Sequence, residues 1–344
     1  MMWLLVFLVV LIVALLATRA IIALGIADSP DEARKLHKEI TPTSGGIGIM
    51  IAVVIGVVIV GLQGVLTVTQ SVMALVLLSL AGGILGLLDD IYVLGAKLKL
   101  LVMLAIVSGF AIFGARIETL EIAPQLTLNL GPILGGLGTV LWLLVLVNTV
   151  NFMDGANGMA IGCAAIGLLG LCGLILLHNR AAQVALHFAV LGWIGAAACS
   201  GFLYWNAAKG RVFAGDAGAL FVGLFCGTFG VLAVVAGVSA FSVALCFLPM
   251  LVDVIITIIL RLRRRENILT PHSHHAYQGA IRHGASHLRM SSMYWLLTLI
   301  CCAAALFALA IGGAAPLWIF ALMVGVLCCH YWMIFADIRA KSHS

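Results

Sequence analysis

The chain has 344 residues, of which 64% are hydrophobic and 9% are charged, and its formal net charge is +5. A soluble domain is about 45–50% apolar and about 25% charged, so this chain has too little polar surface to coat a water-soluble globule. The low charge density also excludes a disordered chain and a nucleic-acid-binding domain, which leaves a polytopic membrane protein.

The apolar residues form runs that are long enough to cross a bilayer, since about 20 apolar residues make one helical span. The first run has no basic segment before it, so it predicts a transmembrane helix rather than a removable signal peptide. Eleven spans are predicted, near residues 3–24, 45–62, 71–88, 98–115, 133–150, 159–177, 182–203, 217–236, 239–260, 291–312 and 316–335. We therefore expect an all-α polytopic membrane protein in which residues 1–344 form a single integral-membrane domain.

The basic residues indicate how these spans are oriented. Only Arg116 and Arg180 fall in one set of alternate connections, and Arg19 lies within the first span. The other set and the C-terminal tail hold Arg34, Lys35, Lys38, Lys97, Lys99, Lys209, Arg211, Arg261, Arg263, Arg264, Arg265, Arg282, Arg289, Arg339 and Lys341. Because cytoplasmic loops are enriched in Lys and Arg, the N-terminus is predicted outside and the C-terminus in the cytoplasm.

One connection on the outer side has the character of strands. Polar and apolar residues alternate within 117–131, on both sides of Ala123-Pro124-Gln125. This alternation, interrupted by a proline, is typical of two short strands joined by a turn. The segment predicts a small extracytoplasmic β-hairpin.

The first polar group on the cytoplasmic side is a pair of adjacent carboxylates, Asp89 and Asp90, at the end of the third span. Adjacent carboxylates repel each other, and removing them from water is costly unless a cation lies close to them. The pair therefore indicates a site for Mg²⁺ or for a basic side chain. A solvated helix cap would explain the same two residues.

The connection after the fifth span carries Asn151, Asp154 and Asn157, spaced by three residues and interleaved with two glycines. Glycine lets the backbone approach a ligand closely. Carboxylate and amide oxygens suit Mg²⁺ and sugar hydroxyls. A plain turn would account for the glycines, but it would leave the amides and the carboxylate unexplained.

A third polar group, Phe213-Ala214-Gly215-Asp216, stands immediately before an apolar run. Asp216 is placed to cap a helix N-terminus, and nothing prevents the same carboxylate from binding a metal. Phe213 could stack on a nucleobase, although a phenylalanine near a membrane more often serves packing. The segment indicates an acidic side chain held at a helix start.

The longest cytoplasmic connection, 261–289, combines a run of arginines with a histidine cluster. The topology of a membrane protein explains the arginines by themselves. It does not explain His272 and His275, which together with Arg264 suit phosphate oxygens. Carboxylates, phosphate-binding cations and an aromatic ring beside apolar helices fit phosphoryl transfer between a nucleotide-linked donor and a lipid acceptor.

At these residues the chain resembles the polyprenyl-phosphate N-acetylhexosamine-1-phosphate transferase superfamily, which includes the phospho-N-acetylmuramoyl-pentapeptide transferases. Asp89-Asp90 matches the paired aspartates of that superfamily, and Lys97 matches the lysine that follows them. Residues 151–158 match its Asn-rich DG motif, and Gly215-Asp216 matches its GD motif. Asn157 is a departure, because the family pattern has a second acid there.

Further matches lie before and after these motifs. The loop 41–46 resembles the segment that leads into the second helix of the family, and Pro249 with Asp253 resembles a Pro-x-x-x-Asp signature. The sequence 275–278 is closer to the branch that initiates O-antigen synthesis than to the pentapeptide transferases. The resemblance thus extends over the first nine spans and the cytoplasmic loops.

The resemblance implies transfer of an N-acetylhexosamine 1-phosphate from a UDP-sugar to undecaprenyl phosphate, with release of UMP, at the start of O-antigen or another cell-envelope polysaccharide. It implies Mg²⁺, with Mn²⁺ as an alternative, bound by Asp216 and Asp154. The catalytic residues it implies are Asp89, Asp90, Asp154, Asp216 and Lys97. The substrate-binding residues are Asn151, Asn157, Asn206, Phe213, His272, His275 and Arg264, of which Asn206 and Phe213 match residues that hold uracil.

The expected setting is the inner (plasma) membrane of a bacterium, crossed many times, with the active site at the cytoplasmic face. The expected partners are the UDP-N-acetylhexosamine, undecaprenyl phosphate and the lipid bilayer, without nucleic acid, and a homodimer would fit the family. UDP-N-acetylglucosamine is the default donor, while a 6-deoxy sugar such as N-acetylfucosamine fits the branch equally well. A one-step and a two-step route both stay open, and so does the choice of the aspartate that acts as base.

An ion- or proton-coupled transporter is the alternative from another functional class, because intramembrane acids often mark ion paths. A transporter of this kind would have acids near the bilayer midplane on several helices. Only Asp253 comes close to that position, since the other acids singled out above gather at one face.

Overall fold

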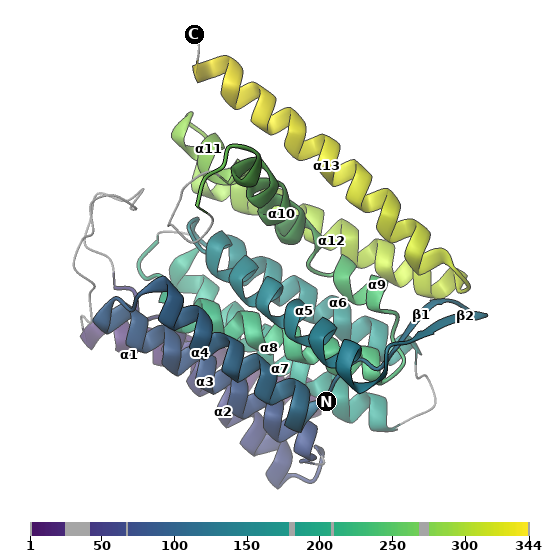
Figure 1. The fold of residues 1–344 in the computed structure, drawn as a ribbon. Coiled ribbons are helices and arrows are strands. Elements are labelled where there is room, and N and C mark those ends of the chain that lie inside the picture. Colours follow the sequence, from purple (N-terminus) through teal and green to yellow (C-terminus); the bar gives the residue numbers. More distant parts are fainter. Residues whose placement is uncertain are drawn as a thin grey trace.

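The computed structural model describes residues 2–24, 42–66, 68–178, 183–207, 210–267 and 275–342. Figure 1 shows a bundle of long helices with α13 along one outer side. The elements are α1 (Met2–Leu24), α2 (Gly46–Leu62), α3 (Gln70–Tyr92), α4 (Ala96–Gly109), the π-helical turn η1 (Phe110–Gly114), β1 (Thr119–Ala123), β2 (Leu126–Asn129), α5 (Gly131–Met153), α6 (Met159–His178), α7 (Gln183–Asn206), α8 (Gly215–Val235), α9 (Ala240–Leu245), α10 (Leu248–Arg263), α11 (Ala276–Arg282), α12 (His287–Ile311) and α13 (Ala315–Ser342).

Each of the eleven predicted spans coincides with helix in the structure. In the part of the chain that the structure describes, nine helices are long and apolar enough to cross a membrane. Helix α2 is apolar but has 17 residues, and the run 239–260 is divided between α9 and α10. The all-α polytopic membrane fold predicted from hydropathy is confirmed.

The division of the run 239–260 has a local cause. Helix α9 ends at Leu245 and α10 begins at Leu248, with Pro249 in its first turn. Proline has no N–H to donate to the carbonyl four residues earlier, so a helix cannot continue through it unchanged. Pro249 therefore determines where α10 starts, and it places Asp253 one turn into that helix.

Helix α8 lies at the centre of the bundle and packs against α2, α3, α5 and α6. In its most apolar stretch, 89% of the residues are buried. Glycines allow this approach. A Cβ atom on Gly46 would overlap the backbone of Gly218, and one on Gly223 would lie 2.8 Å from Cα of Val147. In lipid, where apolar side chains gain little by leaving the solvent, close packing of small residues holds helices together.

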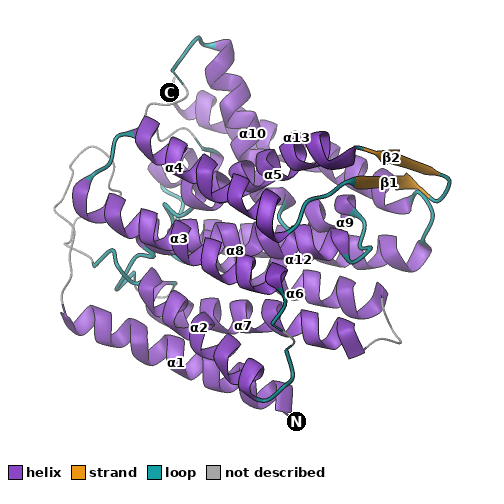
Figure 2. Ribbon diagram, turned by 60° about the horizontal axis from the view of Figure 1, so that its bottom comes forward, coloured by secondary structure: helices purple, strands orange, loops and turns teal. Residues whose placement is uncertain are grey.

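The predicted β-hairpin at 117–131 is confirmed. Strands β1 and β2 pair antiparallel, with Thr119 opposite Asn129 and Leu120 opposite Leu128, and a bulge lies between Glu121 and Ala123. The backbone N–H groups of Leu130 and Gly131 donate to the carbonyl of Glu118 and close the base of the hairpin. Figure 2 shows the hairpin projecting from the end of the bundle opposite the α3–α4 connection.

Candidate active site

Asp89 and Asp90 lie in the last turn of α3, where the chain turns sharply toward α4. Asp89 Oδ1 accepts a hydrogen bond from the backbone N–H of Leu94 at 2.8 Å. Val93 makes this sharp turn possible, since it ends α3 with a left-handed backbone conformation at φ of 50°. Asp89 Oδ2 accepts a second hydrogen bond from Lys99 Nζ, on the first turns of α4, at 2.7 Å.

Asp90 faces the N-terminus of α8. Its Oδ1 accepts from the backbone N–H of Asp216 at 3.0 Å, and its Oδ2 accepts from Ala217 at 3.1 Å. The first N–H groups of a helix have no partner within that helix and favour negative charge. Asp90 therefore fixes the start of α8 from the end of α3.

Glycine is required immediately before Asp216. Gly215 has φ of +67°, in the left-handed region, and a Cβ atom there would overlap the carbonyl oxygen of Thr43 and lie 2.7 Å from Asp90 Oδ2. Any larger residue would push Asp90 away from α8. The fold itself therefore requires glycine before Asp216, whether or not a ligand binds.

The ammonium of Lys99 lies between two carboxylates, because it pairs with Asp216 as well as with Asp89. The side chain of Lys99 is 20% exposed, against 15% for Asp89 and 29% for Asp216. Lys97, the lysine chosen from the sequence, is exposed. The structure therefore brings Lys99 to the aspartates, while a catalytic role for Lys97 stays a prediction.

Asp154 joins this cluster from the turn between α5 and α6. Burial raises the pKa of its carboxyl group well above the ordinary value, and the negative charges of Asp216 and Asp90 raise it further. Both effects disfavour the ionised form. The carboxyl groups of Asp154, Asp216 and Asp90 are thus close enough to act on one another, and Lys99 is the basic side chain that pairs with Asp216 and with Asp89.

Helices α7 and α12 hold the turn that carries Asp154. The side chain of Asn206, at the end of α7, accepts from the backbone N–H of Gly158 and donates to Val212 O at 2.7 Å. Ser291 Oγ donates to Asn157 O at 2.7 Å, and Trp295 Nε1 donates to Gly158 O at 3.0 Å, both from α12. Side chains of α7 and α12 therefore fix the C-terminal end of the turn by bonding to its backbone groups.

These contacts bear on two residues predicted to bind substrate. Asn206 is 2% exposed, and both polar atoms of its side chain bond to backbone groups, so the geometry gives it a positioning role. Asn157 Oδ1 is buried and has no hydrogen-bond partner within the described part of the chain. A buried acceptor without a partner is costly, so Asn157 is available to a donor group of a ligand. Asn151 is partly buried in the last turn of α5.

Phe213 is held by the segment that leads into α2. Its backbone N–H donates to Pro42 O at 2.8 Å, and its carbonyl accepts from Gly45 N at 3.0 Å. The N–H of Gly46 donates to Ala214 O at 3.0 Å. The segment predicted to lead into the second helix therefore supports the start of α8. Residues 25–41, which include most of the basic part of that loop, lie outside the described residues.

The histidine-containing connection approaches the same turn from the other side. His275 caps α11, and its ring lies 6.0 Å from the rings of Phe152 and of Tyr277, measured between centroids. Tyr277 Oη donates to Phe152 O at 3.0 Å. Helix α11 therefore docks on the end of α5, next to Asp154. His272 lies outside the described residues.

Asp253, in α10, anchors the start of α11. It is fully buried in α10, accepts from Tyr294 Oη at 2.5 Å, and accepts from the backbone N–H of Ala276 at 3.2 Å. His275 Nδ1 lies 3.5 Å from the same carboxylate. One acidic side chain thus joins α10, α11 and α12. Asp253 is the acid that an ion path would have used, and here its oxygens bond within the protein.

The donor set fits a divalent cation in charge and chemistry. Within the described residues, no three His, Cys, Asp or Glu side chains gather closely enough to hold a metal by themselves. Mg²⁺ needs no such cage, because it is usually held by one or two carboxylates together with substrate phosphates and water. Asp89, Asp90 and Asp216 share the single lysine Lys99, which leaves negative charge that a cation would offset.

Several residues of this site were not singled out by the sequence argument. Lys99 was noted but not chosen, because the resemblance matched Lys97 to the lysine that follows the paired aspartates. Ser291 and Trp295 belong to an ordinary apolar run, and their contacts with the turn at 151–158 depend on the packing of α12. Arg264 is exposed and lines a cavity with His275 and Arg282, and no motif in the sequence distinguishes Arg282.

The chain is similar to one protein family and to several known proteins. The family described as Glycosyl transferase family 4 matches residues 72–236, which contain Asp89, Asp154 and Asp216. The chain is 31% identical over 290 residues to the probable undecaprenyl-phosphate N-acetylglucosaminyl 1-phosphate transferase of Bacillus subtilis, covering 83% of this chain and 77% of that protein. It is 29% identical to the decaprenyl-phosphate N-acetylglucosaminephosphotransferase of Mycobacterium leprae, covering 76% and 72%. It is 34% identical to the phospho-N-acetylmuramoyl-pentapeptide-transferase of Corynebacterium diphtheriae, covering 55% and 63%.

Proposed function

This chain belongs to glycosyl transferase family 4, and we propose on that premise that it transfers an N-acetylhexosamine 1-phosphate from a UDP-sugar to undecaprenyl phosphate. The observation that carries the proposal is the meeting of Asp89 and Asp216 at Lys99, with Asp90 bonded to the backbone of Asp216 and Asp154 close by. A site with this negative charge suits a diphosphate that is bound together with a divalent cation. It lies at the ends of apolar helices that suit a lipid.

The proposed reaction exchanges one phosphoanhydride bond for another. An oxygen of the lipid phosphate attacks the phosphorus that carries the sugar, and the bond from that phosphorus to the oxygen of UMP breaks. UMP leaves, and the lipid keeps the sugar through a diphosphate. Negative charge spreads over the phosphoryl oxygens in the transition state, so positioned cations supply most of the catalysis. Lys99 is the cation that the chain itself holds beside Asp89 and Asp216.

We assign the metal to Asp216 and Asp154, with Mg²⁺ as the first candidate and Mn²⁺ as the second. When bound, the metal would neutralise oxygens of the donor diphosphate. Asp90 holds the backbone of Asp216, so it would support the metal ligand from behind. Asp89, hydrogen-bonded to Lys99, is the candidate to accept a proton from a protonated lipid phosphate.

UDP-N-acetylglucosamine is the donor that we propose first, because two of the relatives above are named for N-acetylglucosamine phosphate transfer. The reaction would take place at the cytoplasmic face of a bacterial plasma membrane. Lys97, Lys99 and Arg264, at the same end of the bundle as the aspartates, support that orientation. The product would start a cell-envelope polysaccharide, such as O antigen. None of the relatives above is named as a transporter, so that alternative has no support.

The test is UMP release by the purified protein in detergent. The assay contains undecaprenyl phosphate, Mg²⁺ and one of a panel of UDP-sugars that includes UDP-N-acetylglucosamine and UDP-N-acetylgalactosamine. We expect release that needs the lipid, the metal and one particular sugar. Folded protein that releases no UMP with any sugar, and that also fails to exchange labelled UMP into the donor, would refute the proposal.

Two acid-to-amide substitutions make the assay specific to the site. Asp216→Asn is expected to fold and to lose at least about 100-fold in turnover, since one charged group at a phosphoryl centre is removed. Glu121→Gln is the matched control, because Glu121 lies in β1 at the opposite end of the bundle. Equal loss in both variants would mean that the assay reports folding rather than chemistry.

A further inference from the structure

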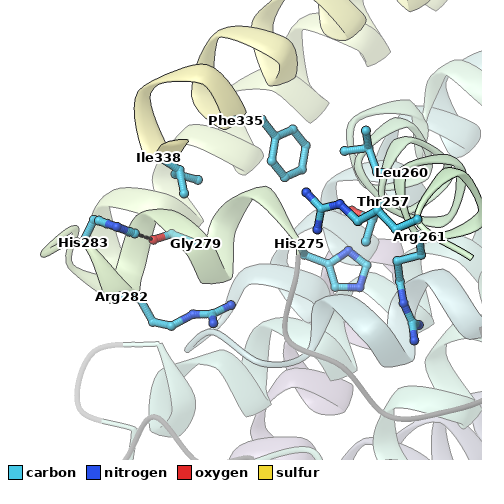
Figure 3. A pocket seen from close by; sticks show the side chains of 10 residues that line it. Thr257, Leu260, Arg261, His275, Gly279, Arg282, His283, Phe335 and Ile338 are labelled. Atoms are coloured by element: carbon cyan, nitrogen blue, oxygen red, sulfur yellow. Dashed lines mark hydrogen bonds between the residues drawn. The ribbon is translucent and has the colours of Figure 1, made fainter. Parts of the chain in front are cut away.

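A cationic site lies between α10, α11 and α13, apart from the carboxylate cluster. It is a cavity of about 180 Å³, and its lining includes three guanidinium groups and two imidazoles. These belong to Arg261, Arg264, Arg282, His275 and His283. The rings of Phe152 and Tyr277 lie against His275, and they connect the site to the turn that carries Asp154. Figure 3 shows the basic side chains gathered beneath α13.

The charge of this cavity is not balanced by its lining. No carboxylate lines it among the residues that the structure describes. Glu266, just outside, pairs with Arg261 at 3.1 Å and lies 3.8 Å from Arg264. Arg261 also donates to Asn267 O at 2.6 Å, and its side chain is only 4% exposed, so its guanidinium is fixed. Asp253 lies behind the lining, 3.5 Å from His275 Nδ1. Three arginines against the two carboxylates of Glu266 and Asp253 leave an excess of positive charge at neutral pH.

The opposite wall is apolar. Leu260 of α10 and Phe335 and Ile338 of α13 complete the lining, and Figure 3 shows the last two reaching in from α13. Charged residues enter α13 at Asp337 and continue with Arg339 and Lys341 in the sequence, so the cavity lies near the polar end of this apolar helix. A ligand with an anionic head and an apolar body matches both walls. A free phosphate would use only one of them.

An adjoining cavity has a mixed lining, with Arg289, His330 and Asp337 beside several apolar side chains. It has a volume of about 630 Å³, lies between α11, α12 and α13, and shares His283 and Ile338 with the first. Met290, Met293 and Met333 are part of its lining. Methionine side chains are flexible and polarisable, so they adapt to an irregular chain. The two cavities together offer a place for a charged head and for part of an acyl chain.

We propose that the cavity between α10, α11 and α13 binds the phosphate headgroup of an anionic phospholipid of the surrounding bilayer, with an acyl chain along the methionines. Basic pockets between membrane helices are recognised sites for such headgroups. Bound lipid would contact His275, which caps α11 and lies against Phe152 of the turn next to Asp154. Occupancy would therefore hold α11 in place, and this binding does not depend on the transferase activity.

The test is lipid binding by the full chain in detergent, with delipidated protein titrated with dioleoyl-phosphatidylglycerol. Dioleoyl-phosphatidylcholine, with the same chains and no net charge, is the lipid control. In R264Q/R282Q we expect affinity for phosphatidylglycerol to fall about 30-fold, because each basic group near an anionic lipid contributes roughly fivefold. The matched control R263Q/R265Q removes the same charge outside the cavity lining and is expected to change affinity less than about threefold.

Three outcomes would overturn the proposal. Equal affinity for the two phospholipids would exclude headgroup recognition, and equal losses in the two double variants would reduce it to general surface charge. Displacement of phosphatidylglycerol by undecaprenyl phosphate, with loss of that displacement in R264Q/R282Q, would make the cavity the site of the acceptor substrate. If the double variant is poorly folded by size-exclusion chromatography, R264Q and R282Q are measured singly, and each should weaken binding about fivefold.

Discussion

Asp90 provides the sharpest test of how the site is built, because its two oxygens bind the first turn of α8 rather than facing Lys99. In Asp90→Ala the N–H groups of Asp216 and Ala217, now bonded at 3.0 and 3.1 Å, lose their acceptor. A hydrogen bond to a charged group contributes about 1.5–3 kcal/mol. Asp90 is partly exposed, so water can replace part of the loss and the lower limit applies to each bond. We expect the free energy of unfolding to fall by about 3 kcal/mol.

The assay is reversible unfolding in mixed micelles, followed by circular dichroism, on the wild type and on Asp90→Ala, Asp90→Asn and Asp89→Ala. Asp90→Asn should lose less than Asp90→Ala, because its amide oxygen can still accept one of the two N–H groups while its NH₂ cannot accept the other. Asp89→Ala should lose less too, since Asp89 accepts only one backbone N–H, from Leu94.

Turnover and stability together decide the outcome. Asp90→Ala is expected to lose turnover as a consequence of moving Asp216, so both quantities should fall. Unfolding within about 0.5 kcal/mol of the wild type, combined with complete loss of turnover, would refute the anchoring role. Asp90 would then act directly on the substrate, and the paired aspartates would have one function instead of two.

Three further predictions concern other charged groups. Lys99→Gln should lower turnover about 100-fold or more in the UMP-release assay, whereas Lys97→Gln should stay within about threefold of the wild type, because only Lys99 lies between carboxylates. Asp253→Ala should lower the free energy of unfolding by about 2–4 kcal/mol and Tyr294→Phe by about 1 kcal/mol, since the first leaves several buried donors unpaired and the second removes one hydrogen bond. Asp154→Asn should raise the melting temperature at neutral pH in metal-free buffer, because the raised pKa shows that the fold disfavours the ionised carboxyl; an unchanged or lower value would contradict this.

Most of the fold could be predicted from the sequence because the positions of membrane helices follow from hydropathy. The hairpin at 117–131 could be predicted as well, since alternation and Pro124 are local signals. The division of the run 239–260 was missed, although Pro249 was visible. A proline within a membrane helix is often tolerated when neighbouring helices satisfy the freed backbone groups, so hydropathy alone does not decide between a kink and a break.

The site was predicted only as a set of candidate residues. Adjacent residues on a helix point about 100° apart, so Asp89 and Asp90 had to face different partners, but the sequence does not state which. Lys97 and Lys99 are about 200° apart on α4, and the one that meets the aspartates depends on the phase of that helix. The turn at Val93, with its left-handed backbone, sets this phase, and a β-branched residue gives no signal for such a conformation.

The same geometry explains why the acids lie where they do. Asp216 is in the first turn of a buried helix, where the helix dipole favours a negative charge, and Asp90 already occupies two of the free N–H groups there. Two anions therefore share one helix terminus. The single positive charge of Lys99 offsets only part of the combined negative charge of Asp89, Asp90 and Asp216. Asp154 adds a fourth carboxyl group, whose ionised form the fold disfavours, as its raised pKa records, with burial as the main cause. A fold selected for stability alone would replace these acids with neutral residues. The function that we propose explains why they are kept, because a cation that arrives with the donor diphosphate would find the carboxylates already in place and would need little reorganisation.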